Sequence, residues 1–268
     1  MPAPQNTFKL ALREKRSQIG FWQALANPYT VEISADAGYD WLLLDAEHAP
    51  NDIPLLVAQL QAMKGSPSHA VIRPPIGETW IIKQLLDIGA QTLLIPMVES
   101  GAQAAELVKA TRYPPHGVRG VGAALARASR FNRIPDYLQT ANEEICLLLQ
   151  IESRAGLAAL DEIAATEGVD GVFIGPADLA ADMGHLGKPG APEVQAEVER
   201  ALLKIQSHGK AAGILIGDLA LAKRYVDLGA TFVAIGNDVT LFANATSKLL
   251  ADFKAVEPAK GAGEAKVY

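Results

Sequence analysis

The sequence contains almost no cysteine, because Cys146 is the only one among its 268 residues. A single thiol excludes an intramolecular disulfide and any zinc site built from several cysteines. Charged residues make up 20% of the chain and apolar residues 49%, a balance that excludes a mainly disordered protein. Positive charge is not in excess, since 24 lysines and arginines face 30 aspartates and glutamates for a net charge of −6. This balance argues against nucleic acid or an anionic lipid surface as a partner.

Long hydrophobic segments are also missing. No apolar run approaches the ~20 residues that a helix needs to cross a bilayer, and residues 1–18 contain no apolar region followed by a cleavage site. We therefore expect a cytoplasmic protein with no membrane partner. At 268 residues the chain is too long for one small sandwich or bundle but has the usual length of one α/β barrel.

The chain does show a repeated alternation of short apolar runs and helical patterns. The runs are mainly apolar and continuous rather than alternating, which is typical of parallel strands covered on both faces. Eight such strands are predicted, at 19–25, 41–45, 69–74, 92–98, 146–152, 171–176, 211–216 and 231–236. Helices are predicted between or after them, at 27–37, 51–64, 79–88, 101–112, 153–167, 192–208, 217–228 and 238–253.

Eight strand–helix units predict a (β/α)8 TIM barrel, an α/β fold, in one domain that spans residues 1–256. An open, doubly wound sheet is the alternative. Residues 113–144 interrupt the pattern, and we expect an elaborated loop with a short helix there. Residues 257–268 are small and polar, as expected of a flexible tail.

Polar residues gather where the predicted strands end. In a barrel of this class the active site is formed by the loops at the carboxyl ends of the strands. The candidates that the sequence places there come from four different strands: Asp45, Glu47, His48, Arg73, Gln150, Glu152 and Asp178.

Two of these carboxylates, Glu152 and Asp178, follow neighbouring strands. Adjacent strands lie ~4.8 Å apart, so both side chains can reach one hard cation such as Mg²⁺ or Mn²⁺, with Gln150 nearby. Water and substrate oxygens would complete the coordination, as in an open catalytic site. The alternative is a pair of solvated carboxylates, one of which caps a helix.

His48 and Arg73 are the other candidates for chemistry. His48 lies three residues after Asp45, and a carboxylate beside an imidazole orients it and raises its basicity; alternatively it is a loop histidine, with Asp52 merely beginning a helix. Arg73 precedes Pro74, which holds it extended, so its guanidinium can bind a carboxylate or stabilise an oxyanion; the alternative is a surface ion pair. The other histidines are expected to be structural or solvent-facing, and the glycine-rich segment 117–122 lacks the context of a nucleotide-binding loop.

Several segments together resemble the HpcH/HpaI aldolase family, which includes the 4-hydroxy-2-oxoheptanedioate aldolases. The resemblance runs from about residue 8 to residue 255, with the segments in the family order. They are LLLDAEHAPND (42–52), VIRPP (71–75), LLIPMVES (93–100), GVRGVG with ARASRFN (117–132), LQIES (149–153) and GVFIGPADLAADMG (171–184).

The resemblance implies a metal-dependent, pyruvate-utilising class II aldolase on a (β/α)8 barrel, with Mg²⁺, Mn²⁺ or Co²⁺ as the cation. It implies a homohexamer in which the C-terminal helix is swapped between subunits. Carried over by position, the family roles fall on His48 as proton acceptor, Arg73 as transition-state stabiliser, Gln150 and Ala177 as substrate contacts, Glu152 and Asp178 as metal ligands, and Asp87 as the residue that raises the basicity of the histidine.

The position of Asp87 in the predicted barrel does not agree with the catalytic role that the resemblance implies. It ends a helix and therefore belongs to the opposite, amino-terminal face, so it can serve a catalytic site only in a neighbouring subunit. The sequence also departs from the family pattern at Phe131 and Ala180, which bears on the choice of acceptor more than on the chemistry.

The expected reaction is the reversible aldol addition of pyruvate or hydroxypyruvate to an aldehyde, which gives a 4-hydroxy-2-oxo acid. No lysine follows a predicted strand as a Schiff-base aldolase would require. Two alternatives stay open: a CoA-ester lyase of the malyl or citramalyl type, and a catalytically silent, oligomeric binding barrel. Helix 238–253 has an apolar stripe, and we expect it to dock on a neighbouring subunit.

Overall fold

The computed structural model describes residues 1–256, and the tail expected at 257–268 lies outside this part of the chain. Eight parallel strands form a closed barrel in the order β1 to β8, so the predicted TIM barrel is confirmed and the open sheet is wrong. The strands are β1 (Gln18–Gln23), β2 (Trp41–Asp45), β3 (His69–Arg73), β4 (Thr92–Ile95), β5 (Cys146–Ile151), β6 (Gly171–Ile174), β7 (Ala211–Leu215) and β8 (Phe232–Asn237).

Large aromatic side chains fill the barrel interior. Trp22, Trp41, Phe173 and Phe232 pack there in one buried cluster, with ring centroids 5.7–6.4 Å apart in each contacting pair. Two glycines make room for two of these rings: a Cβ on Gly20 would lie 2.1 Å from the Trp41 ring, and one on Gly213 would lie 2.2 Å from the Phe232 ring. The interior is therefore a packed core, and only its carboxyl-terminal rim is available for chemistry.

A helix that the strand–helix pattern did not predict closes the amino-terminal end of the barrel. In α1 (Thr7–Arg13), Asn6 caps the first turn by accepting from the Lys9 N–H. Phe8 and Leu12 on this helix belong to the interior cluster, and Phe8 stacks on His69 with ring centroids 5.4 Å apart. The apolar floor beneath the aromatic core therefore comes from the segment before the first strand.

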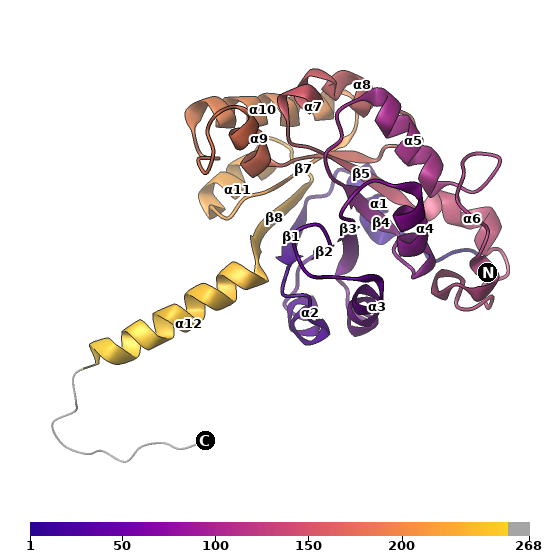
Figure 1. The fold of residues 1–268 in the computed structure, drawn as a ribbon, viewed down its shortest axis with the longest axis horizontal. Helices are drawn as coiled ribbons and strands as arrows, with labels where there is room; N and C mark the ends of the chain where they lie inside the picture. Colours follow the sequence, from indigo (N-terminus) through magenta and orange to yellow (C-terminus); the bar gives the residue numbers. More distant parts are fainter. Residues whose placement is uncertain (257–268) are drawn as a thin grey trace, which may run out of the picture.

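All of the remaining helices except the last surround the barrel (Figure 1). They are α2 (Pro28–Ala35), α3 (Ile53–Ala62), α4 (Thr79–Asp87), α5 (Gly101–Thr111), α6 (Tyr137–Glu144), α7 (Arg154–Ala158), α8 (Leu160–Ala165), α9 (Pro176–Asp182), α10 (Pro192–Ser207), α11 (Leu219–Asp227) and α12 (Asp238–Ala255). Most follow the predicted positions. Within residues 1–256, no helix combines the length and apolarity required to span a membrane.

Three departures from the predicted elements have local causes. β4 ends at Ile95 because Pro96 has no N–H to donate to a neighbouring strand. The helix predicted at 153–167 is two short helices, interrupted at Ala159. Residues 176–182 form α9, because Pro176 is well suited to a first helical turn. The expected elaborated loop at 113–144 is confirmed: it contains two 3₁₀ turns (Ala123–Leu125 and Arg127–Ser129) before α6.

The C-terminal helix α12 projects away from the barrel instead of packing on it (Figure 1). Asp238 is its only buried residue, and the Asp238 carboxylate accepts from the Ala24 and Leu25 N–H groups at 2.8 and 3.0 Å. Beyond this anchor the apolar stripe is exposed, with Phe242 63% and Phe253 76% accessible. A long apolar helix face in water is costly.

Candidate active site

Asp45 and Arg73 form a fixed ion pair at the carboxyl-terminal rim of the barrel. They occupy paired positions at the ends of β2 and β3. Arg73 Nε donates to Asp45 Oδ1 at 2.9 Å and Nη2 donates to Oδ2 at 2.7 Å. The Arg73 guanidinium also lies over the ring of Trp22, 5.0 Å from its centroid, and Trp22 Nε1 donates to Asp45 Oδ2. Two hydrogen bonds and the Trp22 ring therefore hold the buried Arg73 guanidinium in a single orientation, and Trp22 also fixes Asp45.

The electrostatics of Asp45 follow from this geometry. Burial alone would raise the pKa of its carboxyl group, but the hydrogen bond and charge of Arg73, helped by the Glu47 N–H and Trp22, lower it below its ordinary value. Asp45 is therefore ionised, and its role is to orient Arg73.

Glu47 is a component of the site that the sequence analysis named but gave no role. Arg73 Nη1 lies 2.7 Å from its Oε2, and His48 Nε2 lies 3.8 Å from the same oxygen. Burial raises the pKa of Glu47, an effect that Arg73 opposes and that the nearby Asp45 and Asp178 carboxylates reinforce.

The carboxylate nearest His48 is therefore Glu47, whereas we expected Asp45, whose oxygens are already taken by Arg73 and Trp22. Asp52 caps α3 by accepting from the Leu55 N–H, as the alternative interpretation held. The His48 side chain is 67% exposed, so it stands at the open mouth of the site.

The second half of the rim is formed by Gln150 and Glu152 at the end of β5. Gln150 Nε2 donates to Glu152 Oε2 at 2.5 Å, and the Met97 N–H donates to Glu152 Oε1 at 3.0 Å. Gly175 leaves the space that these groups need, because a Cβ there would lie 2.5 Å from Glu152 Oε2 and 3.2 Å from Gln150 Nε2. Gln150 Oε1 is buried without a hydrogen-bond partner among residues 1–256.

Asp178 lies in the first turn of α9, beyond Gly175, and it is exposed together with Ala177. Burial is the main reason that the pKa of Glu152 is raised, and repulsion from Glu47 and Asp178 adds to it. The carboxylates of Glu47, Glu152 and Asp178 thus concentrate negative charge beside the Arg73–Asp45 ion pair. In the described part of the chain, no three His, Cys, Asp or Glu side chains already stand in a metal-binding arrangement, so protein ligands alone do not complete a coordination sphere.

Asp87 is not part of this constellation. It is the last residue of α4, at the amino-terminal end of the barrel, as the sequence placed it. Arg119 Nη2 lies 3.1 Å from Asp87 Oδ1, and the Arg119 side chain is fully buried beneath the ring of Tyr113, 4.4 Å from its centroid. Arg119 lies in the irregular segment before α6, where no strand or helix period predicts its contact with Asp87.

The chain is similar to known aldolases in sequence and in structure. Residues 18–245 match the family model described as HpcH/HpaI aldolase/citrate lyase. A hydroxypyruvate/pyruvate aldolase of Pseudomonas aeruginosa is 59% identical over 262 residues, which cover 98% of both chains. A 4-hydroxy-2-oxo-heptane-1,7-dioate aldolase of Escherichia coli is 57% identical over 94% of this chain and 96% of its own. A family structure from Burkholderia cenocepacia, 41% identical, superimposes with a TM-score of 0.90 over 94% of this chain and 100% of its own.

Proposed function

We propose that this protein acts on 2-oxo acids with the help of a divalent cation. The chain belongs to the HpcH/HpaI aldolase/citrate lyase family and is an aldolase, a carbon–carbon lyase. The donor is pyruvate or hydroxypyruvate, and the product of addition to an aldehyde is a 4-hydroxy-2-oxo acid. The names of the Pseudomonas and Escherichia relatives support these donors and this product class. Their activity as aldolases favours this reaction over a CoA-ester lyase or a silent binding barrel.

The observation that carries the proposal is the juxtaposition, on one rim, of an immobilised guanidinium and a separate group of carboxylates. Arg73 is held by Asp45, Glu47 and Trp22. Glu152 and Asp178 lie close enough to repel each other. A 2-oxo acid carries an anionic carboxylate and a keto oxygen. Both groups would be stabilised by positive charge, from the Arg73 guanidinium on one side and from a cation bound by Glu152 and Asp178 on the other.

Glu152 and Asp178 would hold the cation. Their hard oxygen donors suit Mg²⁺, Mn²⁺ or Co²⁺. Gly175 lets the Glu152 and Gln150 side chains lie close to this point, and the buried Gln150 Oε1, which has no partner within residues 1–256, is a further oxygen there that a ligand would satisfy. A bound cation would supply Lewis-acid polarisation of the keto oxygen. The cation would also offset the repulsion among Glu47, Glu152 and Asp178.

The protein's own residues would move the proton and stabilise the charge. His48 accepts a proton from C3 of the donor, with Glu47 as the carboxylate beside it. Arg73 stabilises the negative charge that develops on oxygen, and its fixed position means that no reorganisation is needed at that moment. Gln150 and the Ala177 N–H orient the 2-oxo acid, since N–H groups in a first helical turn have no acceptor within the helix.

The chemistry does not require a Schiff base. No lysine within residues 1–256 lies at the carboxyl end of a strand, which supports enolate chemistry of the class II type. The sequence and the site therefore favour the same mechanism.

The proposal extends to a homo-oligomer, with a hexamer as the expected state. Asp87 lies at the opposite end of its own barrel from His48, so its family role requires a neighbouring subunit. The exposed face of α12 is the surface on which we expect such a neighbour to dock, by exchange of this helix.

One experiment tests the core of the proposal. Enzymatic enolate formation exchanges the C3 protons of pyruvate with deuterium from solvent faster than in a solution with the same metal and no enzyme, and NMR measures this exchange without an aldehyde. Exchange is expected with added Mn²⁺ and not after removal of metal with EDTA. Exchange at the same rate in EDTA would contradict metal dependence, and no exchange in either case would contradict pyruvate as donor.

A further inference from the structure

A cavity of about 340 Å³ opens at the amino-terminal end of the barrel, opposite the catalytic rim. Its wall is formed by α1, by the segments that lead into β6, β7 and β8, and by the turn after α10. The volume falls in the range of small-molecule sites. The aldolase reaction uses none of the residues that line it.

The cavity wall is strongly positive in a protein that is negative overall. Four cationic side chains line it, those of Lys9, Arg13, Lys15 and Lys210, against one acidic side chain, that of Asp170. The whole chain has a net charge of −6. A concave site lined by charges of one sign raises the local concentration of ions of the opposite sign.

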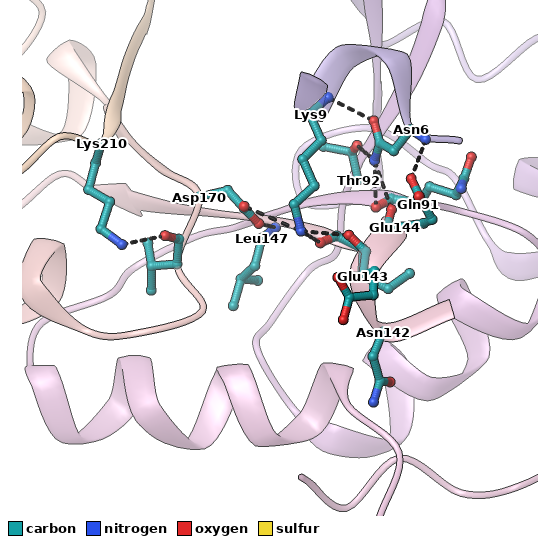
Figure 2. Close-up of polar contacts among 12 residues, drawn as sticks. Asn6, Lys9, Gln91, Thr92, Asn142, Glu143, Glu144, Leu147, Asp170 and Lys210 are labelled. Atoms are coloured by element: carbon teal, nitrogen blue, oxygen red, sulfur yellow. Dashed lines mark hydrogen bonds and ion pairs between the residues drawn. The ribbon is translucent and has the colours of Figure 1, made fainter. Parts of the chain in front are cut away.

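Two of the cations are held by the fold (Figure 2). Lys9 Nζ donates to the carbonyl oxygens of Glu143 and Ile145 at 3.0 and 2.6 Å and lies 3.4 Å from Asp170 Oδ1. Lys210 approaches from the other side, where its Nζ donates to the Val169 carbonyl at 2.7 Å. Burial lowers the pKa of Lys210, and the negative charges of Asp170 and Glu167 oppose this effect only in part.

In the part of the chain that the structure describes, the other two cations form no ion pair and one buried hydroxyl has no hydrogen-bond partner. Within residues 1–256, Arg13 and Lys15 form no ion pair. Thr231, which lines the cavity and is 9% exposed, has a buried Oγ1 without a hydrogen-bond partner in the same part of the chain. Buried hydroxyl groups are normally paired.

We propose that this cavity binds a small organic anion that carries phosphate or carboxylate groups. Arg13 and Lys15 bind its charged groups, Thr231 Oγ1 donates one hydrogen bond, and Lys210 gains a further negative neighbour besides Asp170. The anion joins α1 to the starts of β7 and β8, and therefore fixes the helix that closes the barrel floor. This site is separate from the aldolase site in position and in lining.

Isothermal titration of the metal-free, full-length protein tests the proposal, with inorganic phosphate, the tricarboxylate tricarballylate and uncharged glycerol as probes. One saturable site per chain is expected for at least one anion and none for glycerol. The tighter of the two anions identifies the ligand as a phosphate compound or a polycarboxylate. Arg13→Gln with Lys15→Gln is expected to raise the Kd about tenfold, because two charge-assisted contacts are lost, and Thr231→Val is expected to raise it severalfold.

Two control variants keep the test specific. Lys223→Gln removes an equally charged side chain that is 72% exposed and paired with Asp227, and it is expected to leave the Kd unchanged. Arg73→Lys, at the catalytic rim, is also expected to leave it unchanged. The proposal is overturned if neither anion saturates, if the Arg13 and Lys15 double variant binds as tightly as the parent, or if Arg73→Lys weakens binding as much as that double variant does. Circular dichroism confirms that each variant is folded.

Discussion

The guanidinium of Arg73 and the carboxylate of Asp45 lie face to face, joined by two parallel hydrogen bonds of 2.9 and 2.7 Å. The strand register places both residues at the same height on neighbouring strands, so the backbone of the barrel sets this geometry. Trp22 beneath the guanidinium and Glu47 beside it remove the remaining freedom. The Arg73 guanidinium is therefore held in position before a substrate binds.

Arg73→Lys is expected to lower kcat by about 10²–10³-fold, the usual effect of losing one preorganised oxyanion donor. Lysine keeps the charge but cannot form both hydrogen bonds to Asp45 or lie flat on Trp22. Steady-state kinetics with pyruvate and an aldehyde measure the change. Arg224→Lys is the matched control, since Arg224 is 61% exposed and paired with Glu199. A rise in KM with kcat unchanged would show that Arg73 only binds substrate.

Asp178→Ala and Glu152→Ala are each expected to abolish the activity that added Mn²⁺ supports, while the melting temperature stays near that of the parent. The reason is that each variant leaves a single carboxylate for the cation. Metal analysis after dialysis measures the stoichiometry. Asp182→Ala is the control, because Asp182 lies on the same helix but pairs with Arg154. A double variant of Glu152 and Asp178 that keeps the parent's metal content would refute the assignment.

His48→Ala is expected to lower turnover by about 10²–10⁴-fold, the range of a general-base contribution. Pyruvate affinity should change little, since other groups hold the substrate carboxylate. Turnover and pyruvate binding are measured separately, with His116→Ala, an exposed loop histidine, as the control. Turnover within threefold of the parent would mean that another group accepts the proton.

His69 should make the fold sensitive to mild acid. Burial between the Phe8 ring and Thr92 lowers its pKa from 6.5 to about 4. The unfolded chain therefore takes up a proton between these values while the folded chain does not, and stability falls as the pH falls from 6.5 towards 4. At pH 5 this loss is up to about 2 kcal/mol.

Urea unfolding at pH 7 and pH 5 measures this effect. His69→Gln, which can still bond to Thr92, is expected to lose less stability than the parent over the same interval. Equal losses in both proteins would place the acid sensitivity elsewhere.

Truncation after Thr240 is expected to dissociate the assembly. This end point keeps Asp238, whose carboxylate caps the end of β1 through Ala24 and Leu25, and removes the exposed apolar face of α12. Light scattering at micromolar concentration measures the mass. An intact oligomer after truncation, or a fully active monomer before it, would contradict helix exchange and with it the role of Asp87 across an interface.

The barrel could be predicted from the sequence because each strand is built mainly of apolar residues without alternation, and β2 has the bounds of its run, 41–45. α1 was missed because no strand precedes it, although Phe8 and Leu12 are apolar residues four positions apart. α9 was missed because Gly175 and Pro176 look like a loop in the sequence, yet proline is favoured in a first turn.

The site residues could be predicted only as far as the strands extend. Asp45 and Arg73 end neighbouring strands, so their proximity follows from the topology. Beyond a strand end no period fixes the direction of a side chain, which is why the carboxylate beside His48 is Glu47 and not Asp45. Arg119 approaches Asp87 from an irregular segment 32 residues away in the chain, a pairing for which the sequence contains no repeat or spacing.

The position of Trp22 gives the active site an optical reporter of its own. Its indole lies under the Arg73 guanidinium and donates to Asp45, so its emission depends on the charge and the solvent directly above it. The other two tryptophans lie elsewhere, Trp41 deeper in the core and Trp80 on the surface, 53% exposed. With both replaced by phenylalanine, the tryptophan fluorescence of the protein comes from Trp22 alone, and ligand binding at the rim can be followed without any label.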